Sequence, residues 1–329
     1  MITIEAKNLS KEFIIGIKEP GFLGVLRSFF NRKTKTIAAV KEISFAIEQG
    51  ELVGFLGPNG AGKTTTLKLI SGLLYPTSGQ LHLLGHLPSN REKAMQMRFA
   101  MVMGQRSQLW WDLPAKETFL LNQKIYEIPD HEYAEMETEL VELLELEDLL
   151  MVPVKKLSLG QRMKAEIACS LLHRPQVLLL DEPTLGLDIL MQKKLRQFIK
   201  EYNRKYRSTI LLTSHNMTDV EELCKRVIII NGGSILYDGD LGEIVQRCAP
   251  EKLITLSTSR PLERSDLERF GRVVSLNNDL AKIEVPRQRV SQAVGELLGA
   301  LPIDDLSIEE MPIEEIIERF FIKDAPAFR

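Results

Sequence analysis

The chain has 329 residues, of which 44% are hydrophobic and 26% charged, so we expect a packed globular protein of about two domains. Its formal net charge of -3 argues against broad nucleic-acid binding, which calls for a basic surface. The N-terminus lacks the apolar stretch of a signal peptide, and no segment approaches the roughly 18–20 apolar residues of a membrane span, so another chain is expected to supply any spans.

The first predicted element is a strand over residues 2–13, where apolar side chains alternate with polar ones. It ends at Phe13, whose ring could stack on a purine base or belong to the core, and the spacing favours neither. Residues 39–47 predict a second strand, and Gly50 suits the turn that follows it.

Residues 14–36 look like an insertion between these two strands. Pro20-Gly21 interrupts the chain, and apolar side chains from Phe22 to Phe30 then recur with helical spacing. Five basic residues and one acidic residue lie between positions 18 and 35. An amphipathic helix that is both aromatic and basic suits contact with anionic lipid or with a membrane partner. Packing of this helix on its own domain is the alternative.

A phosphate-binding loop is the strongest signal in the sequence. Residues 57–65 fit G-x-x-x-x-G-K-[ST], with an apolar strand over 52–56 before them and helical spacing after them. Glycines let the backbone approach phosphate oxygens, and the N–H groups at the start of the helix attract an anion. Lys63 can reach the β- and γ-phosphates, and the Thr64 hydroxyl can hold Mg²⁺. The loop consists of Gly57, Pro58, Asn59, Gly60, Ala61, Gly62, Lys63, Thr64 and Thr65.

The segment after this loop changes from strands to helices. Short strands are predicted over residues 80–85 and 99–105, the second of which ends at the polar Gln105. Residues 107–157 are predicted to be mostly helical, with a solvated acidic face. Trp110 and Trp111 are adjacent, and they belong either to the core or to an exposed docking site.

The histidines and cysteines give no metal-binding pattern. His82 and His86 have no acidic or cysteine cluster around them in the sequence, so we interpret them as incidental. The three cysteines are far apart and form no C-x-x-C, which favours free thiols in a reducing compartment.

A second anion site is indicated at residues 157–161. They precede a helix predicted over 162–173, and Ser158 can cap its N-terminus. The cap is either purely structural, or its hydroxyl and the helix N-terminus form a second phosphate cradle. Spacing does not say whether that cradle would meet the loop of its own chain or that of a second subunit.

Two acidic residues end the apolar strand predicted over residues 176–183. Ligands of parallel sheets bind at the carboxyl ends of the strands, so Asp181 can hold Mg²⁺ and Glu182 can polarise an attacking water. Another buried strand over residues 209–215 ends at His215, which could contact a γ-phosphate. Residues 226–234 then predict a strand followed by a hairpin turn.

The tail over residues 250–329 carries none of this chemistry. Strands are predicted over 253–256, 272–275 and 281–285, and helices over 261–270, 290–301 and 313–321. Ile313, Ile316, Ile317 and Phe320 share one face of the last helix. This order of elements predicts a small α+β accessory domain.

With these elements placed, residues 1–245 resemble the nucleotide-binding subunit of ABC transporters. Residues 57–65 look like Walker A, residues 157–161 like the LSGGQ element, and residues 178–182 like Walker B. Gln105 resembles the Q-loop glutamine, residues 185–188 the D-loop, and His215 the switch histidine. The chain departs from the family pattern at Leu159, where glycine is usual, and at Phe13, where tyrosine is common.

The resemblance implies an α/β fold: a P-loop NTPase domain of the ABC type over 1–245, with a helical subdomain over about 105–165, and a C-terminal α+β domain over 250–329. It implies ATP and Mg²⁺ as ligands. The implied catalytic residues are Glu182, His215 and Gln105, and the implied metal ligands are Thr64, Gln105 and Asp181. The implied nucleotide contacts are residues 57–65, Phe13, Ser158, Gly160, Gln161 and Asp188.

The resemblance implies a head-to-tail homodimer, in which each ATP lies between the phosphate loop of one copy and the Ser158-Gly160 turn of the other. Residues 57–66 with residues 71–79 look like the drug-resistance, ABC-2 exporter type, and residues 103–114 look like a bacterial ABC-2-type ATPase. The 14–36 insertion resembles the interfacial gate region of polysaccharide-exporter ATPases. We therefore expect a peripheral protein on the cytoplasmic face of the membrane, bound to an ABC-2-type permease, with no nucleic-acid partner. An importer ATPase, a soluble ABC ATPase and a non-hydrolysing scaffold are the alternatives, and drug, lipid and glycan all stay open as cargo.

Overall fold

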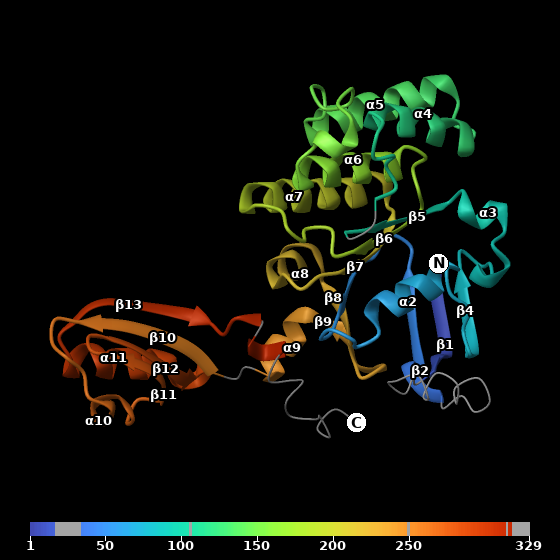
Figure 1. Ribbon diagram of the computed structural model, residues 1–329. Coiled ribbons are helices and arrows are strands. Elements are labelled where there is room, and N and C mark those ends of the chain that lie inside the picture. The colour runs from blue at the N-terminus through green and yellow to red at the C-terminus, as the bar shows by residue number, and fades with distance from the viewer. Residues whose placement is uncertain (17–33, 105–106, 249–250, 314, 318–329) are drawn as a thin grey trace, which may run out of the picture. The chain divides into compact units, whose positions relative to one another are not determined.

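The computed structural model describes residues 1–16, 34–104, 107–248, 251–313 and 315–317 (Figure 1). The chain forms two compact units, residues 1–239 and 240–329. Each unit has its own hydrophobic core within the described residues.

A six-stranded sheet with the order β5-β6-β7-β3-β8-β9 is the frame of the first unit. The pairs from β5 through β8 are parallel, and β6 and β7 are buried along their whole length, as central strands covered on both faces are. The strands are β3 (Leu52–Leu56), β5 (Phe99–Met103), β6 (Val177–Asp181), β7 (Thr209–Thr213), β8 (Arg226–Asn231) and β9 (Ser234–Asp240). Parallel pairing brings the carboxyl ends of β3, β6 and β7 to one edge, where the predicted site residues lie.

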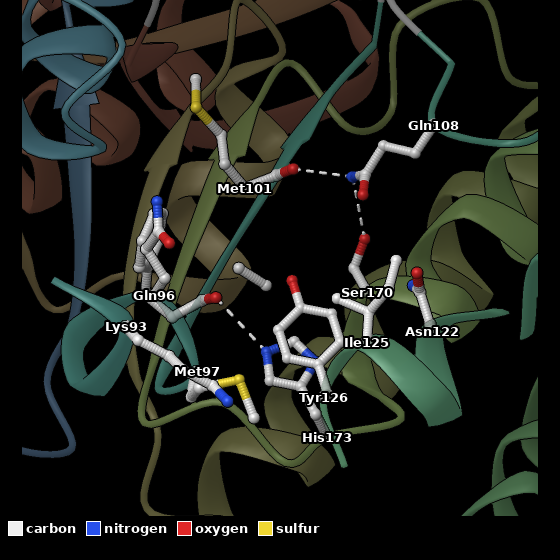
Figure 2. Close-up of a pocket in the computed structure, with 12 residues that line it drawn as sticks. Lys93, Gln96, Met97, Met101, Gln108, Asn122, Ile125, Tyr126, Ser170 and His173 are labelled. Carbon is white, nitrogen blue, oxygen red and sulfur yellow. Dashed lines mark hydrogen bonds between the residues drawn. The ribbon is translucent and has the colours of Figure 1, made fainter. Parts of the chain in front are cut away.

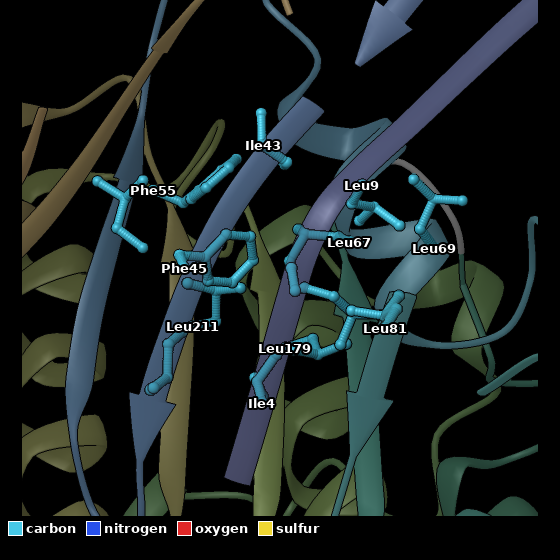
Figure 3. Packing of buried hydrophobic residues seen from close by; sticks show 14 of the residues in the cluster. Ile4, Leu9, Ile43, Phe45, Phe55, Leu67, Leu69, Leu81, Leu179 and Leu211 are labelled. Carbon is cyan, nitrogen blue, oxygen red and sulfur yellow. The ribbon is translucent and has the colours of Figure 1, made fainter. Parts of the chain in front are cut away.

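A second sheet is antiparallel and has the order β2-β1-β4, with β1 (Ile2–Gly16), β2 (Thr34–Glu48) and β4 (Ser78–Leu83). The core of the unit lies between the two sheets and helix α2 (Lys63–Ile70). Figure 3 shows Ile4 and Phe45 of this sheet facing Leu179 and Leu211 of the parallel sheet, with Leu67 of α2 among them. Burial of these apolar groups holds the phosphate-loop helix rigidly between the sheets.

The remaining helices of the first unit gather near β5, β6 and β7 (Figure 1). Their bounds are α3 (Lys93–Gln96), α4 (Ala115–Ile125), α5 (Asp130–Leu144), α6 (Leu159–Leu171), α7 (Ile189–Tyr206) and α8 (Met217–Leu223), with short 3-10 helices over Pro88–Asn90 and Val154–Lys156. Within the described ranges, none of the helices combines the length and apolar composition that crossing a bilayer requires.

The second unit begins with α9 (Leu241–Cys248) and contains an antiparallel sheet of order β11-β12-β10-β13. Its other elements are β10 (Glu251–Thr258), α10 (Arg264–Leu267), β11 (Arg272–Asn277), β12 (Leu280–Pro286), α11 (Val290–Ala300) and β13 (Ile303–Glu310), with a 3-10 helix over Arg287–Arg289. Apolar residues of the sheet pack with Leu267 and with Ala293 and Leu297 of α11 to form the core. The architecture is the predicted α+β.

The edges of the predicted insertion over 14–36 are wrong. Strands β1 and β2 stay paired as far as Gly16 and Thr34, because Ile14, Ile15 and Ile37 favour extended backbone. The predicted amphipathic helix from Phe22 to Phe30 lies outside the described residues.

Other element boundaries also need correction. The strand predicted over 80–85 ends at Leu83, since Leu84 and Gly85 both adopt positive φ in a turn. Strand β13 was missed, because its sequence IDDLSIEE is strongly acidic, and it pairs with β10 at the edge of its sheet. Residues 313 and 315–317 are helical as predicted, whereas Phe320 lies outside the described residues.

Candidate nucleotide-binding and catalytic site

The phosphate loop lies between β3 and the N-terminus of α2. A side chain at Gly57 would place its Cβ 2.2 Å from the Ile230 carbonyl oxygen, and one at Gly62 would place it 2.5 Å from the Ala39 carbonyl oxygen. Gly62 also adopts φ +112° and supplies no side-chain cap for α2. The first N–H groups of the helix therefore lack a side-chain acceptor from the cap and suit an anion.

Lys63 lies inside this loop and is only 6% exposed. Its Nζ donates to the Gly57 carbonyl at 2.7 Å and to the Pro58 carbonyl at 3.2 Å. Burial lowers the pKa of Lys63, and the nearby carboxylates of Glu182 and Asp181 act in the opposite direction. The ammonium group is thus held where a phosphate bound by the loop would receive its hydrogen bonds.

Oxygen ligands for a divalent cation meet beside the loop. The Thr64 hydroxyl lies 3.0 Å from Asp181 Oδ2, and the Thr213 hydroxyl donates to Asp181 Oδ1 at 2.7 Å. No cluster of three or more acidic, histidine or cysteine side chains suited to a metal occurs among the described residues. One carboxylate with one hydroxyl fits Mg²⁺, which uses few protein ligands and completes its shell with phosphate and water.

Glu182 and His215 form a pair at the same edge of the sheet. His215 Nε2 lies 3.0 Å from Glu182 Oε1, and the two side chains are 40% and 21% exposed, respectively. Glu182 adopts φ +56°, which is costly for a residue with a side chain. Its N–H donates to the Thr213 carbonyl at 3.0 Å, so hydrogen bonding to β7 holds this strained backbone.

The Ser158 turn is a regular helix cap. The Ser158 Oγ accepts from the Gln161 N–H at 3.2 Å, and the Gln161 side chain accepts from the Ser158 N–H at 2.9 Å, forming a capping box on α6. In the described part of the chain, no hydrogen bond joins this turn to the phosphate loop. A Cβ at Gly160 would meet only Leu187 and Met191, at 3.6 and 3.7 Å, so packing within the chain does not require glycine there.

The remaining predicted site residues are Asp188, Phe13 and Gln105. Asp188 caps α7 by accepting from the Met191 N–H at 2.9 Å. Phe13 is half-buried, with Lys11 Nζ 5.3 Å from its ring centroid. Gln105 lies outside the described residues, but the N–H of Gly104 donates to the Asp181 carbonyl at 3.0 Å.

A separate pocket of about 400 Å³ lies where α3 and β5 face α4 and α6 (Figure 2). Tyr126 and His173 stack in it with ring centroids 3.8 Å apart. His173 Nε2 lies 3.3 Å from the Phe99 carbonyl oxygen, whereas its buried Nδ1 has no partner. Burial lowers the pKa of His173 to about 4. The sequence gives no local signal for this pocket, because its walls come from three separate segments of the chain, residues 93–108, 122–126 and 170–173.

The two tryptophans are exposed, so the core alternative for them is wrong. Trp110 and Trp111 are 56% and 53% exposed, and the Arg162 guanidinium lies 5.6 Å from the Trp111 ring centroid. The two tryptophans therefore belong to the surface near the start of α6.

The chain is similar to ATP-binding proteins of ABC transporters. A family model described as ABC transporter matches residues 40–185, and one described as EvrA-like ABC transporter, C-terminal domain, matches residues 250–309. The ABC transporter ATP-binding protein NatA of Bacillus subtilis is 36% identical over 224 residues, covering 68% of this chain and 91% of NatA. The linearmycin resistance ATP-binding protein LnrL of the same organism is 29% identical over 294 residues, covering 88% of this chain and 93% of LnrL. The solved dimeric structure of MJ0796, a bacterial ABC transporter cassette, is similar with a TM-score of 0.59 and 25% identity, over 72% of this chain and 98% of that one.

Proposed function

The chain belongs to the ABC transporter ATP-binding proteins, a family of ATP hydrolases, and from this premise we propose that it powers an ABC-2-type exporter. It acts as a homodimer bound to membrane permease chains. One observation carries the catalytic part of the proposal: Lys63, the Thr64–Asp181 pair and the Glu182–His215 pair converge at one edge of a parallel sheet.

Each group has a chemical task in the proposed site. Lys63 and the loop N–H groups hold the β- and γ-phosphates. Thr64, Asp181 and Gln105 are the proposed Mg²⁺ ligands, and the bound ion would neutralise phosphate charge. Glu182 accepts a hydrogen bond from the attacking water and orients it toward the γ-phosphorus, while His215 holds the Glu182 carboxylate and contacts the γ-phosphate.

A head-to-tail dimer completes this site in the proposal. The Ser158-Gly160 turn of one copy would cover the ATP bound by the other, with Gln161 and Asp188 beside it and Phe13 stacked on the adenine. The absence of any packing reason for glycine at 160 supports close approach by another molecule. The dimeric state of the similar MJ0796 cassette supports the pairing of two copies.

The membrane partner is proposed to dock at the pocket between α3, β5, α4 and α6. Strand β5 lines this pocket, and Gln105, a proposed Mg²⁺ ligand, comes two residues after the end of β5, so a segment bound in the pocket would be linked to the nucleotide site through β5. In this proposal the protein lies peripherally on the cytoplasmic face of the membrane. The 14–36 segment is the proposed additional contact with anionic lipid. The name of LnrL, a resistance protein, supports export rather than import.

The test compares ATP hydrolysis in membranes with and without the co-encoded permease, for the wild type and for Glu182→Gln. We expect Glu182→Gln to bind ATP normally and to lose at least about 100-fold in turnover, the usual scale for a lost general base. Glu268→Gln is the control, because Glu268 is an exposed glutamate paired with Arg264 in the second unit. Normal turnover in Glu182→Gln would contradict the site, and turnover unaffected by the permease would contradict the transport role.

A further inference from the structure

A single buried carboxylate joins the two loops that carry Glu182 and His215. Asp219 of α8 is completely buried. Its Oδ2 accepts from the Thr184 hydroxyl at 2.5 Å and from the Ser214 hydroxyl at 2.7 Å. Thr184 comes two residues after Glu182, and Ser214 comes one residue before His215. One oxygen atom therefore fixes the spacing between the two chain segments.

The second oxygen of this carboxylate is held from α7. Arg196 Nη1 donates to Asp219 Oδ1 at 3.0 Å, and Arg196 is buried, with 6% of its surface exposed. Glu222 lies on the solvent side of the same guanidinium, with its Oε2 3.0 Å from Arg196 Nε and half of its side chain exposed. Asp219 thus has a charged partner that fixes the orientation of its carboxylate, which two hydroxyl groups alone would not do.

Gln192 of α7 strengthens the link at a second point. Its Nε2 donates to the Leu187 carbonyl at 3.0 Å, and its Oε1 accepts from Asn216 Nδ2 at 3.0 Å. The loop after Glu182 and the loop around His215 are therefore joined twice, once through Asp219 and once through Gln192.

We propose that Asp219 is a positioning residue for ATP hydrolysis, which holds Glu182 and His215 in register through Thr184 and Ser214. The inference rests on the proposed roles of Glu182 and His215. Neighbouring residues must hold the Glu182 carboxylate 3.0 Å from the His215 imidazole and keep Glu182 at its positive φ. Asp219 supplies this support through its hydrogen bonds to Thr184 and Ser214. Its own side chain touches neither the Glu182 carboxylate nor the His215 imidazole.

The variant Asp219→Asn keeps the shape but replaces one acceptor oxygen with a donor, so it cannot bind both hydroxyls and Arg196. Measured on the full chain, kcat should fall roughly 10- to 100-fold, since a misplacement of about 1 Å can cost about 100-fold. The KM for ATP and the affinity for a fluorescent ATP analogue should stay at wild-type values, because the phosphate loop is unchanged. Glu222→Gln is the matched control: it removes a carboxylate from the same guanidinium without touching either loop, and its kcat should equal that of the wild type.

A double variant tests whether Asp219 positions the catalytic residues or only stabilises the fold. Asp219 with the Thr184 and Ser214 hydroxyls forms what we call the clamp. Thr184→Val removes one of its hydroxyls, and the loss in kcat should not multiply with that of Asp219→Asn, because both variants disturb the same connection. If Asp219→Asn does not fold, Thr184→Val and Ser214→Ala test the clamp singly, each with lowered kcat and unchanged nucleotide affinity expected.

The outcomes distinguish the clamp from the proposed catalytic site. Wild-type turnover that depends on Glu182, together with full kcat in Asp219→Asn or in both single-hydroxyl variants, would overturn the clamp alone. Wild-type turnover that is insensitive to Glu182→Gln would overturn the proposed site and the clamp with it.

Discussion

Lys63 shows how one side chain depends on the loop around it. Its ammonium group is buried and donates to two loop carbonyls, an arrangement that an incoming phosphate can share or replace. Replacing Lys63 with alanine removes a charge-assisted hydrogen bond of about 1.5–3 kcal/mol, so ATP affinity should fall roughly 10- to 100-fold. Equilibrium binding of a fluorescent ATP analogue measures this loss. Lys68→Ala, at the other end of α2, is the control, and unchanged affinity in Lys63→Ala would refute the phosphate contact.

Gly186, in the loop before α7, gives a residue-scale prediction about stability. It adopts φ +74°, and a Cβ there would lie 2.5 Å from the Leu159 Cδ2 atom. Since Leu159 is half-exposed and can swing aside, the backbone cost should dominate. Gly186→Ala should lower the free energy of unfolding by about 1–2 kcal/mol, and Gly186→Asn by less.

Denaturant titration of these variants measures that cost. Repeating Gly186→Ala in a Leu159→Ala background should leave the penalty nearly the same. A penalty that vanishes in that background would show that the contact with Leu159, rather than φ, is the cause.

At the scale of elements, the contact between α4 and α6 is predicted to weaken in acid. The stacked His173 and Tyr126 follow these two helices, and burial lowers the pKa of His173 from 6.5 to about 4. Between these two pH values the unfolded chain binds more protons than the folded one, so stability falls as pH drops from about 6.5 toward 4. Burial explains the direction, because the protonated ring would lose its hydration and a proton on the unpartnered Nδ1 would gain no hydrogen bond.

The loss from His173 should approach roughly 3 kcal/mol at the acid end, from 2.5 units of pKa at about 1.36 kcal/mol each. The measurement is the free energy of unfolding against pH for the wild type and for His173→Phe, which keeps a ring for stacking on Tyr126. Subtracting the two curves isolates the contribution of His173 from that of other titratable groups, such as Glu166, whose pKa is raised by burial. Parallel curves would argue against a buried neutral His173.

At the scale of the whole molecule, the two units have separate cores. Among the residues that the structure describes, the first core contains none beyond Ile235 and the second contains none before Ile254. A chain ending at Asp240, the last residue of β9, should therefore fold and keep hydrolysis that depends on Glu182. Circular dichroism and kcat measure the two properties against the full chain. Hydrolysis lost from a folded fragment would assign the second unit a part in catalysis.

The amino-acid sequence by itself determined the α/β class, the family and most strands of the parallel sheet. It could do so because Asp181 directly follows an apolar run, and Lys63 and His215 come a few residues after one, so the order of residues along the chain shows these strand ends directly. The roles of these residues stay predictions. The edges of the insertion and the acidic strand β13 were mispredicted, since pairing with a neighbouring strand outweighed local composition.

Only the tertiary structure decided which distant side chains meet. Asp219 accepts a hydrogen bond from Thr184, which lies 35 residues earlier in the chain. His173, which follows α6, stacks on Tyr126, which follows α4. Thr213 and Ser214 beside His215 were a readable signal of extra polar groups at that strand end, whereas Asp219 and Arg196 resemble any other charged helix residues. The physical reason is that burial and hydrogen bonding depend on distances in space, which the packing of the sheet and helices sets after the local elements have formed.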